Sequence, residues 1–325
     1  MNRTQVDDEI IAIGDSLLRF LEREVAPLED ANRELLATDR TIYDERGYFV
    51  EEVAALRRTV RMRSAEQGFY TMFGPEEIGG GGLGPVAAVY LNALLAEASG
   101  PGRVLVHPVV VPSPFTNGLS PVLTALGEDQ RARFLPGLAS GEKTLCFALS
   151  EPDAGSDVFG MKSRAVRDGD DWIITGTKQW ITNGPYADYV MVFAVTDPEL
   201  ASQRKGGITG FFVETASAGF SVASTIPVMG HLGAEIGILS FDGVRVPDVQ
   251  RLGEAGQGLK VAMNGVNTGR LGLSATCIGL ARWALNQALD YAKVRKILES
   301  RLANTRRCRS CWPKVRWISI RPKPC

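Results

Sequence analysis

The first third of the chain has a helical pattern of hydrophobic positions. Apolar residues separated by three or four positions form a stripe along one face of a helix. The first such stripe consists of Ile10, Ile13, Leu17, Leu21 and Val25. We expect this helix to end at Pro27, because proline cannot continue the hydrogen bonding of a helix interior. The same pattern predicts helices over 49–67 and 85–98 and a further helical stretch before Gly141.

The spacing then changes to short apolar runs bounded by Gly, Pro, Asp and Ser, which is typical of β-strands. These runs cover residues 190–195, 210–213, 220–223 and 238–241. Helical spacing returns from about residue 258 to residue 296. The sequence therefore predicts an α+β protein. Its expected parts are an N-terminal helical domain over 1–144, a middle β-sheet or open-barrel domain over 145–250 and a partial C-terminal helical bundle over 251–296.

The composition is that of a globular protein. The 325 residues are 45% hydrophobic but contain no long apolar run, so we expect no membrane span. The N-terminus lacks a basic segment followed by an apolar one, so we expect no secretory signal and a cytoplasmic location. The chain has only two histidines, His107 and His231. A histidine-rich metal site or a His-based catalytic triad is therefore not expected.

Charge separates residues 297–325 from the rest of the chain. This segment has eight Lys or Arg residues against Glu299 alone, which leaves 28 basic and 36 acidic residues before it. Cys308 and Cys311 have the spacing of half a zinc site, but no second pair or histidine lies near them. A basic nucleic-acid-binding tail is the other specific hypothesis, although short basic segments are common, and we expect no nucleic-acid partner. We interpret 297–325 as a basic, Cys- and Pro-containing tail foreign to the body, such as an out-of-frame end.

The helical stretch over 258–296 has apolar residues that require partner helices. They include Ile278, Trp283, Leu285 and Leu289. The tail contains prolines and no helical stripe, so it cannot supply such a partner. We therefore expect an exposed apolar patch on the last helix and a disordered tail.

Glycines over 79–84 match the dinucleotide-binding pattern G-x-G-x-x-G. That pattern binds a dinucleotide only between a buried strand and a helix, and the preceding residues, Phe73 to Glu77, do not form a strand pattern. We interpret the glycines as a loop between two helices.

The most informative stretch begins at Cys146. An apolar, strand-like run from Leu145 to Leu149 leads into the loop SEPDAGSD over 150–157. Gly155 permits a close approach of the main chain, and successive N–H groups with the Ser156 hydroxyl can bind a pyrophosphate. An ordinary strand-to-loop turn is the alternative interpretation of this segment alone.

A second segment, DWIITGTKQWITNG, begins at Asp171. Its pattern predicts a hairpin whose strands flank Gly176 and Thr177. Trp180 and Thr182 alternate onto one face of the second strand. A flat aromatic ring beside a hydroxyl suits an isoalloxazine ring, which offers a π surface and hydrogen-bond acceptors. An ordinary hairpin is again the alternative.

Together the two segments resemble the acyl-CoA dehydrogenase family, whose middle domain has a T/S-E-P-x-A-G-S-D loop and a W-I-T-N-G strand around FAD. The resemblance includes Pro75-Glu76-Glu77, GITGFFVE over 207–214 and FDGVRVP over 241–247, and it extends to about Lys296. It implies helical, β and helical domains in that order, with the last domain incomplete. It also implies a flavoprotein oxidoreductase of fatty acid metabolism that removes hydrogens from the α and β carbons of an acyl-CoA thioester.

The family resemblance also assigns roles to individual residues. Phe147, Leu149 and Ser150 match residues that meet the flavin ring, and Trp180 and Thr182 match the aromatic residue packed on the ring and the hydroxyl near its N5. Ser156 matches a serine near the pyrophosphate and the bound thioester. Asn267 and Arg270 match the substrate end of the pocket. Arg295 matches an arginine that reaches the FAD of a neighbouring subunit, and its alternative role is a solvated charge at a helix end.

The catalytic base is missing from both places that the family uses. Most members have a glutamate far along the C-terminal bundle, in a region without a counterpart here. A minority have it directly before the arginine matched by Arg270, and that position is Gly269. We therefore expect impaired catalysis in a truncated enzyme. The alternatives are a non-catalytic remnant that binds FAD or acyl-CoA weakly and an acyl-CoA oxidase-type relative. Expected partners are an acyl-CoA, an electron-transfer flavoprotein and, were the bundle complete, identical subunits in a dimer or tetramer.

Overall fold

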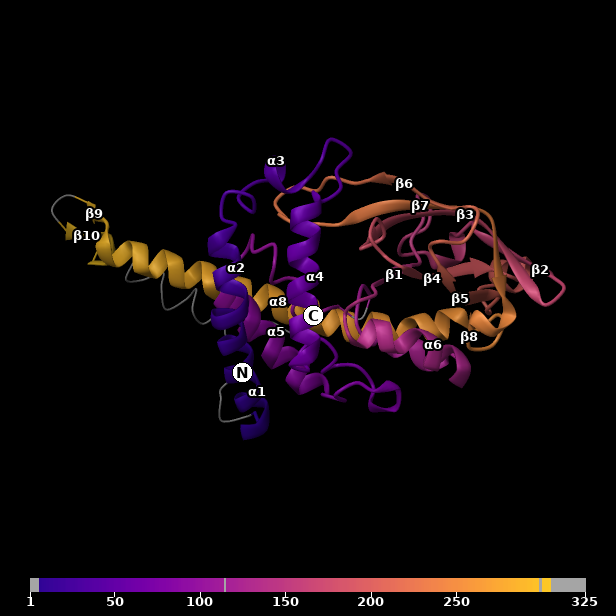
Figure 1. The fold of residues 1–325 in the computed structure, drawn as a ribbon, viewed down its shortest axis with the longest axis horizontal. Helices are drawn as coiled ribbons and strands as arrows, with labels where there is room; N and C mark the ends of the chain where they lie inside the picture. Colours follow the sequence, from indigo (N-terminus) through magenta and orange to yellow (C-terminus); the bar gives the residue numbers. More distant parts are fainter. Residues whose placement is uncertain (1–5, 114, 298–299, 305–325) are drawn as a thin grey trace. The chain divides into compact units, whose positions relative to one another are not determined.

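The computed structural model describes residues 6–113, 115–297 and 300–304 (Figure 1). The chain divides into two compact units. The first comprises residues 1–22, 84–103 and 270–325, and the second comprises residues 23–83 and 104–269. Helix α8, Gly258–Val294, passes through the boundary between them.

Helices make up most of the first unit. Helix α1, Asp8–Phe20, packs on α5, Pro85–Ser99, at Gly14, where a Cβ atom would lie 2.8 Å from Leu94 Cδ2. The second half of α8 packs on α5 at Gly279, where a Cβ atom would lie 2.3 Å from the Ala93 carbonyl oxygen. Glycine is needed at position 279, where a side chain would meet the main chain of α5, whereas at position 14 the nearest atom is the end of a leucine side chain, which can shift.

Pro27 does not end the first helix, so that prediction is wrong. A π-helical turn, Leu21–Val25, follows α1 and leads directly into α2, Ala26–Ala31. Pro27 lies in the first turn of α2, where its missing N–H group leaves no intrahelical hydrogen bond unmade. Because the π turn lies between α1 and Pro27, the proline ring does not interrupt the regular i to i−4 hydrogen bonds of α1.

The other predicted helices are present. The helix predicted over 49–67 is α4, Glu51–Glu66, the helix predicted over 85–98 is α5, and the stretch before Gly141 contains α6, Glu128–Ala139. Residues 79–84 form a loop that follows a short 3₁₀ helix, Glu76–Ile78, so the dinucleotide-binding pattern lacks the strand it would need. Short helical elements complete the list: α3 Asp39–Ile42, α7 Pro198–Ser202 and 3₁₀ turns at Pro121–Ala125, Val158–Gly160, Asp248–Gln250 and Leu302–Asn304.

An eight-stranded sheet dominates the second unit. The strands are β1 Leu145–Ala148, β2 Arg164–Asp168, β3 Asp171–Thr182, β4 Tyr189–Val195, β5 Ile208–Glu214, β6 Phe220–Thr225, β7 Ile236–Pro247 and β8 Arg251–Leu252. Their order is β6-β7-β3-β2-β4-β5-β8, and β1 pairs with β4 in parallel. All four apolar runs named above lie within these strands, which confirms the predicted middle β region.

The hairpin predicted over residues 172–182 is wrong. Residues Asp171–Thr182 form one continuous strand, β3, which pairs with β2 on one side and β7 on the other. The hairpin turn lies earlier, between the paired residues Asp168 and Asp171. Gly176 is a point where the register of β3 shifts against β7, and it has a φ of +154°. Glycine within a strand often marks such an irregularity rather than a turn.

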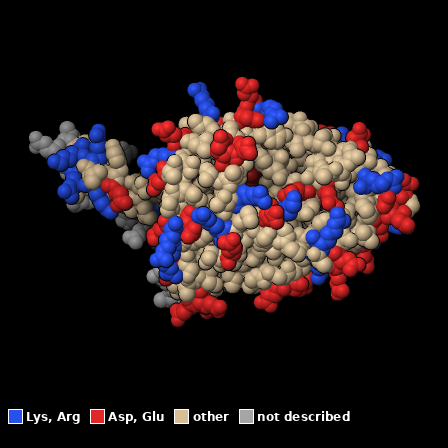
Figure 2. All heavy atoms as spheres, in the orientation of Figure 1, with Lys and Arg blue, Asp and Glu red and all other residues tan. Residues whose placement is uncertain are grey.

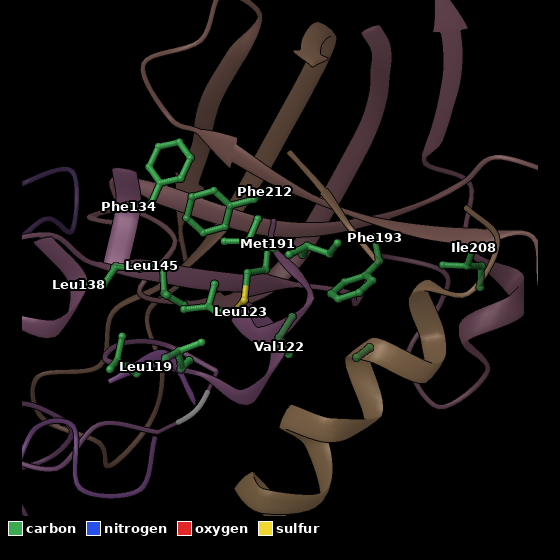
Figure 3. Packing of buried hydrophobic residues seen from close by; sticks show 14 of the residues in the cluster. Leu119, Val122, Leu123, Phe134, Leu138, Leu145, Met191, Phe193, Ile208 and Phe212 are labelled. Atoms are coloured by element: carbon green, nitrogen blue, oxygen red, sulfur yellow. The ribbon is translucent and has the colours of Figure 1, made fainter. Parts of the chain in front are cut away.

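Two hydrophobic clusters fill the second unit, one on each face of the sheet. One consists largely of alternate strand residues such as Ile174, Val190 and Phe211. The other lies between the strands and the segment around α6, and it includes Ala262 of α8. Figure 3 shows members of this second cluster, with Leu145, Met191, Phe193 and Phe212 of the strands lying near Leu119, Val122 and Leu123.

The apolar residues that are exposed near the end of the chain are not the ones predicted for the patch on the last helix. Ile278, Trp283, Leu285 and Leu289 are each partly buried. The exposed large apolar residues of this region are Leu271, Leu273, Tyr291, Val294 and Ile297. Of these residues, Trp283 lies against Gly100 at the end of α5, and its neighbour Arg282 pairs with Glu97 of α5 at 3.6 Å.

The predicted disorder of the tail falls mostly on residues outside those the structure describes. Two short strands, β9 Lys296–Ile297 and β10 Ser300–Arg301, form a small antiparallel pair after α8. Figure 2 shows Lys and Arg side chains gathered at this end of α8, whereas both signs of charge are mixed over the rest of the visible face. None of the described helices is long and apolar enough to cross a membrane. The described residues also hold no cluster of side chains suited to a metal ion.

Candidate functional site

A buried ion pair joins the two segments singled out in the sequence. Lys178 of β3 is fully buried, and its Nζ donates to Glu151 Oε1 at 2.7 Å and to the Leu149 carbonyl oxygen at 3.1 Å. Directly beside this pair, the Gln179 N–H donates to the Ser150 carbonyl oxygen at 2.9 Å. The SEPDAGSD loop is therefore fastened to β3 within two residues of Trp180. The loop and the Trp180 strand therefore lie side by side, as two segments that contact one ligand must.

Glu151 is the centre of this attachment. Besides the Lys178 ammonium, its carboxylate accepts hydrogen bonds from the N–H groups of Lys162 at 2.6 Å and Ser163 at 3.1 Å. Burial raises the pKa of Glu151, but the Lys178 charge and these donors outweigh it, and the pKa lies below its usual value. Burial lowers the pKa of Lys178, and the nearby carboxylate opposes that shift. We take the pair as ammonium and carboxylate at neutral pH because Glu151 has three donors to satisfy its charge.

The far side of the loop presents unused donors. Glu151 and Ala154 exchange two main-chain hydrogen bonds of 2.8 and 3.3 Å, which fold the loop into a tight turn. Gly155 and Ser156 are exposed, and within the part of the chain that the structure describes their N–H groups donate no hydrogen bond. No atom lies within 4 Å of a Cβ placed on Gly155. Consecutive free N–H groups beside open space can bind an anionic group such as a phosphate.

Trp180 has an unusual position in β3. Its φ is +66°, and the register of β3 against β7 shifts between Lys178 and Ile181. Because of this bulge, Lys178 and Ile181 are both buried, whereas Trp180 between them is 56% exposed. Positive φ is rare for a bulky residue, and such strain is concentrated at functional sites. Thr182, two residues further on, is partly buried.

Asn183 organises the end of β3, and the sequence did not single it out. It is buried with a φ of +62°, and its Nδ2 donates to the carbonyl oxygens of Leu145 at 2.9 Å and Thr116 at 3.2 Å. It thereby connects β3 to the start of β1 and to the loop before α6. The Asn-Gly dipeptide was the available signal, because Asn tolerates positive φ better than other non-glycine residues.

The remaining predicted residues lie on two elements. Phe147, Leu149 and Ser150 are partly buried at the end of β1, and the Phe147 ring packs on Phe115 and Phe193 with centroid distances of 5.3 and 5.0 Å. Asn267 and Arg270 are exposed on α8, and Arg295 is exposed directly after its last turn.

The boundary between the two compact units falls between Gly269 and Arg270. The structure thus brings together the predicted residues of the loop, β1 and β3 with Asn267 within one unit, whereas Arg270 and Arg295 belong to the other. The roles assigned to these two arginines stay predictions.

This arrangement fits a flavin dinucleotide by the chemistry of its donor set. The loop offers free N–H groups and a serine hydroxyl for a pyrophosphate, while an exposed indole offers a flat apolar surface for a ring. Both are fixed to each other through the Lys178–Glu151 pair. The sheet with its attached helices and this site define the class, a flavoprotein oxidoreductase fold.

Comparison with known proteins identifies the family. The N-terminal, middle and C-terminal domains of acyl-CoA dehydrogenases match residues 7–142, 146–244 and 256–310. The last match continues past Lys296, where the sequence resemblance was expected to end. The chain belongs to the acyl-CoA dehydrogenase family, whose members are FAD-dependent oxidoreductases.

Individual relatives agree with this assignment. The caffeyl-CoA reductase-Etf complex subunit CarC of Acetobacterium woodii is 34% identical over 290 residues, which cover 89% of this chain and 71% of that protein. An acyl-CoA dehydrogenase of Bacillus subtilis is 35% identical over 223 residues, covering 68% of this chain and 56% of that protein. Glutaryl-CoA dehydrogenase from Mycobacterium smegmatis in complex with FADH2 has a TM-score of 0.76 at 26% identity, covering 98% of this chain and 73% of that one. The chain thus spans little more than half to about seven tenths of these relatives.

Proposed function

We propose that this chain binds FAD and acts on the α and β carbons of an acyl-CoA thioester, in the direction of dehydrogenation. The observation that carries the proposal is the buried Lys178–Glu151 pair, which holds a loop with free N–H groups beside an exposed, strained tryptophan. The family membership supports FAD as the group that this site holds. Both dehydrogenases and a reductase subunit are among the relatives, so the direction of the reaction belongs to the proposal.

The residues of the second unit have separate tasks in this proposal. Gly155 and Ser156 hold the pyrophosphate through their N–H groups and the serine hydroxyl. Trp180 packs against the flavin ring, and Thr182 supplies a hydroxyl at its edge. Phe147 closes the apolar side and excludes water from the reacting carbons. When bound, FAD supplies the acceptor for the hydride that leaves the β carbon.

Removal of the α-proton requires a base, and position 269 cannot supply one. A Cβ atom on Gly269 would lie only 1.9 Å from Phe115 Cε2, so a carboxylate side chain does not fit there beside the present ring. This observation favours a second candidate function, in which the chain binds FAD and thioester with little turnover. Positioned acid–base groups typically contribute 10²- to 10⁴-fold in rate.

The partner that reoxidises the flavin is proposed from the relatives. One of them is a subunit of a complex with Etf, which supports an electron-transfer flavoprotein as the partner of this chain. An oxidase-type relative would instead pass its electrons to molecular oxygen. We also retain a cytoplasmic location and an oligomeric assembly as proposals.

The test begins with the full chain loaded with FAD and kept free of oxygen. If a base is available, addition of butyryl-CoA is expected to bleach the flavin absorption near 450 nm. If the thioester binds without turnover, the absorption band is expected to shift without bleaching. Readmission of oxygen then separates the two kinds of relative, because rapid recovery of the band indicates an oxidase. A chain that retains FAD but shows neither bleaching nor a shift with any acyl-CoA would contradict the proposed substrate class.

A further inference from the structure

A second buried ion pair lies in the same unit as the Trp180 bulge. It joins Arg57 of α4 to Glu235, the residue directly before β7. The two side chains are 6% and 5% exposed, and Arg57 Nη2 donates to Glu235 Oε2 at 2.9 Å. Arg57 Nη1 donates to the Val104 carbonyl oxygen at 2.7 Å, and the guanidinium lies 4.7 Å from the centre of the Phe49 ring. The residue before β7 is thereby attached to helix α4.

Stability alone does not account for this pair. Burial removes both charges from water, and an apolar pair of similar volume is often as stable or more stable. Glu235 also has a buried oxygen, Oε1, that accepts no hydrogen bond from any residue the structure describes. A buried acceptor without a donor costs free energy. What the Arg57 contact does provide is a single fixed position for residue 235.

The main chain of Glu235 holds the end of β3. The Asn183 N–H donates to the Glu235 carbonyl oxygen at 2.6 Å, and Thr182 pairs with Ile236, the first residue of β7. These contacts follow the shift in register that leaves Trp180 exposed. The position of residue 235 therefore sets where β3 resumes its pairing with β7 beyond the bulge.

The bulge requires support on both sides. Trp180 has a φ of +66°, and a bulky residue keeps such a conformation only where its surroundings enforce it. Before Trp180, the buried Lys178–Glu151 pair supplies this support. After Trp180, the attachment of Glu235 to α4 is the corresponding restraint.

We propose that Arg57 and Glu235 are positioning residues for the flavin site, because their ion pair fixes the start of β7 and thereby holds Trp180 and Thr182 in the geometry that receives the flavin ring. The inference rests on the proposed function. Both side chains act through the main chain of β3 and touch no cofactor. Without the pair, the end of β3 has to be ordered when FAD binds. Ordering one residue changes the affinity by about tenfold.

The test compares stability with FAD binding in variants of the full chain. Arg57→Met should lower the midpoint of denaturant unfolding, because it leaves Glu235 as an uncompensated buried charge. Arg57→Met/Glu235→Met should recover most of that loss, since no charge then stays buried. The FAD dissociation constant should rise about tenfold in both variants. A pair that only stabilises the fold would instead let FAD affinity recover together with stability.

A spectrum of the saturated complex reports the position of the ring itself. The visible circular dichroism of bound FAD should change in Arg57→Met/Glu235→Met, because the ring meets a displaced indole. Glu235→Gln retains an acceptor for Arg57 and should keep the spectrum of the unmodified chain. Arg57→Lys keeps the charge but loses the planar fork that reaches both Glu235 and the Val104 carbonyl oxygen. It should change the spectrum in the same direction by less, and it serves if the methionine variants fold poorly.

Arg133→Met/Glu214→Met is the matched control. Arg133 of α6 pairs with Glu214 of β5 at 2.8 Å, and its guanidinium lies 4.6 Å from the centre of the Phe134 ring. It thus matches Arg57 in the kind of contacts it makes, although it is more exposed and holds β5 rather than the start of β7. This control should leave both FAD affinity and the flavin spectrum unchanged.

The results also separate this inference from the proposed function. In Arg57→Met/Glu235→Met, an FAD dissociation constant within about twofold of the unmodified value, or an unchanged flavin spectrum, overturns the inference alone. A folded full chain that binds no FAD overturns the proposed function and the inference with it.

Discussion

Replacement of Lys178 by methionine tests the attachment between the SEPDAGSD loop and β3. The Lys178 side chain is fully buried and that of its partner Glu151 is 4% exposed. Loss of one member leaves the other as an uncompensated buried charge, which typically costs about 3–5 kcal/mol. Glu151 keeps its two main-chain donors from Lys162 and Ser163, so we expect Lys178→Met to lie at the lower end of that range.

The double variant Lys178→Met/Glu151→Gln should be more stable than Lys178→Met. Glutamine retains an acceptor for the main-chain N–H groups but carries no charge, so no unpaired charge stays in the core. Both variants lose the hydrogen bond to the Leu149 carbonyl oxygen. Both should therefore bind FAD more weakly than the unmodified chain, because the loop that holds the pyrophosphate is no longer fixed.

The assay is denaturant unfolding of the FAD-free chain, combined with FAD dissociation constants from flavin fluorescence. Lys162→Met is the matched control, because Lys162 pairs with Asp153 of the same loop in an exposed ion pair at 2.5 Å, and exposed pairs contribute little. Equal stability of Lys178→Met and Lys162→Met, or unchanged FAD affinity in Lys178→Met, would refute the reasoning.

Three other predictions follow from individual side chains. Trp180→Ala should leave the FAD-free chain about as stable as before, because the indole is largely exposed. It should nevertheless weaken FAD binding more than Thr182→Val, which loses a hydroxyl worth about 0.5–1.5 kcal/mol. Equal FAD dissociation constants of the two variants would count against this. Because folding lowers the pKa of Glu151, this carboxylate stabilises the fold fully above the pKa of about 4.5 that it has in the unfolded chain, and the stabilisation is lost as the pH falls below that value. Glu151→Gln should therefore make the stability less dependent on pH in the acid range. An unchanged pH dependence would contradict the assignment. Burial raises the pKa of the Cys146 thiol, whereas Cys277 is exposed. Mass spectrometry after brief alkylation should therefore find Cys277 modified and Cys146 intact. Early labelling of Cys146 would contradict its burial.

Hydrophobic spacing was sufficient to predict most of the fold. The period of the apolar stripe identified α4 and α5 to within a few residues, and short β-type runs located β4, β5, β6 and β7. Pro27 was misread because a π turn places it at the start of a new helix, and spacing contains no signal for a π turn. The domain limits at residues 144, 250 and 296 stay predictions.

The site was predictable where a segment has its own chemistry. The sequence predicts an anion-binding loop from Gly155 and Ser156, and this role stays a prediction. In the structure both residues are exposed, and their N–H groups donate no hydrogen bond within the described part of the chain. The setting of Trp180 was not predictable, because the bulge that exposes it depends on the register between β3 and β7. For the same reason Gly176 was misread as a turn residue.

Contacts between individual distant residues could not be predicted. Phe115 and Gly269 are more than 150 positions apart. The Phe115 ring excludes a side chain at position 269 only because the fold packs the loop before α6 against α8. The role of Glu151 was likewise hidden, since its partner Lys178 reads as an ordinary strand residue until the fold buries it.

The central claim is that the second unit holds FAD through the SEPDAGSD loop and β3, and the visible absorption spectrum tests it most directly. The full chain is purified, incubated with excess FAD and freed of unbound flavin by gel filtration. The account predicts a yellow protein with about one FAD per chain, and a clear loss of bound flavin in Trp180→Ala. A folded chain that stays colourless after saturation with FAD, or one whose bound flavin is unaffected by Trp180→Ala and Lys178→Met alike, would contradict it.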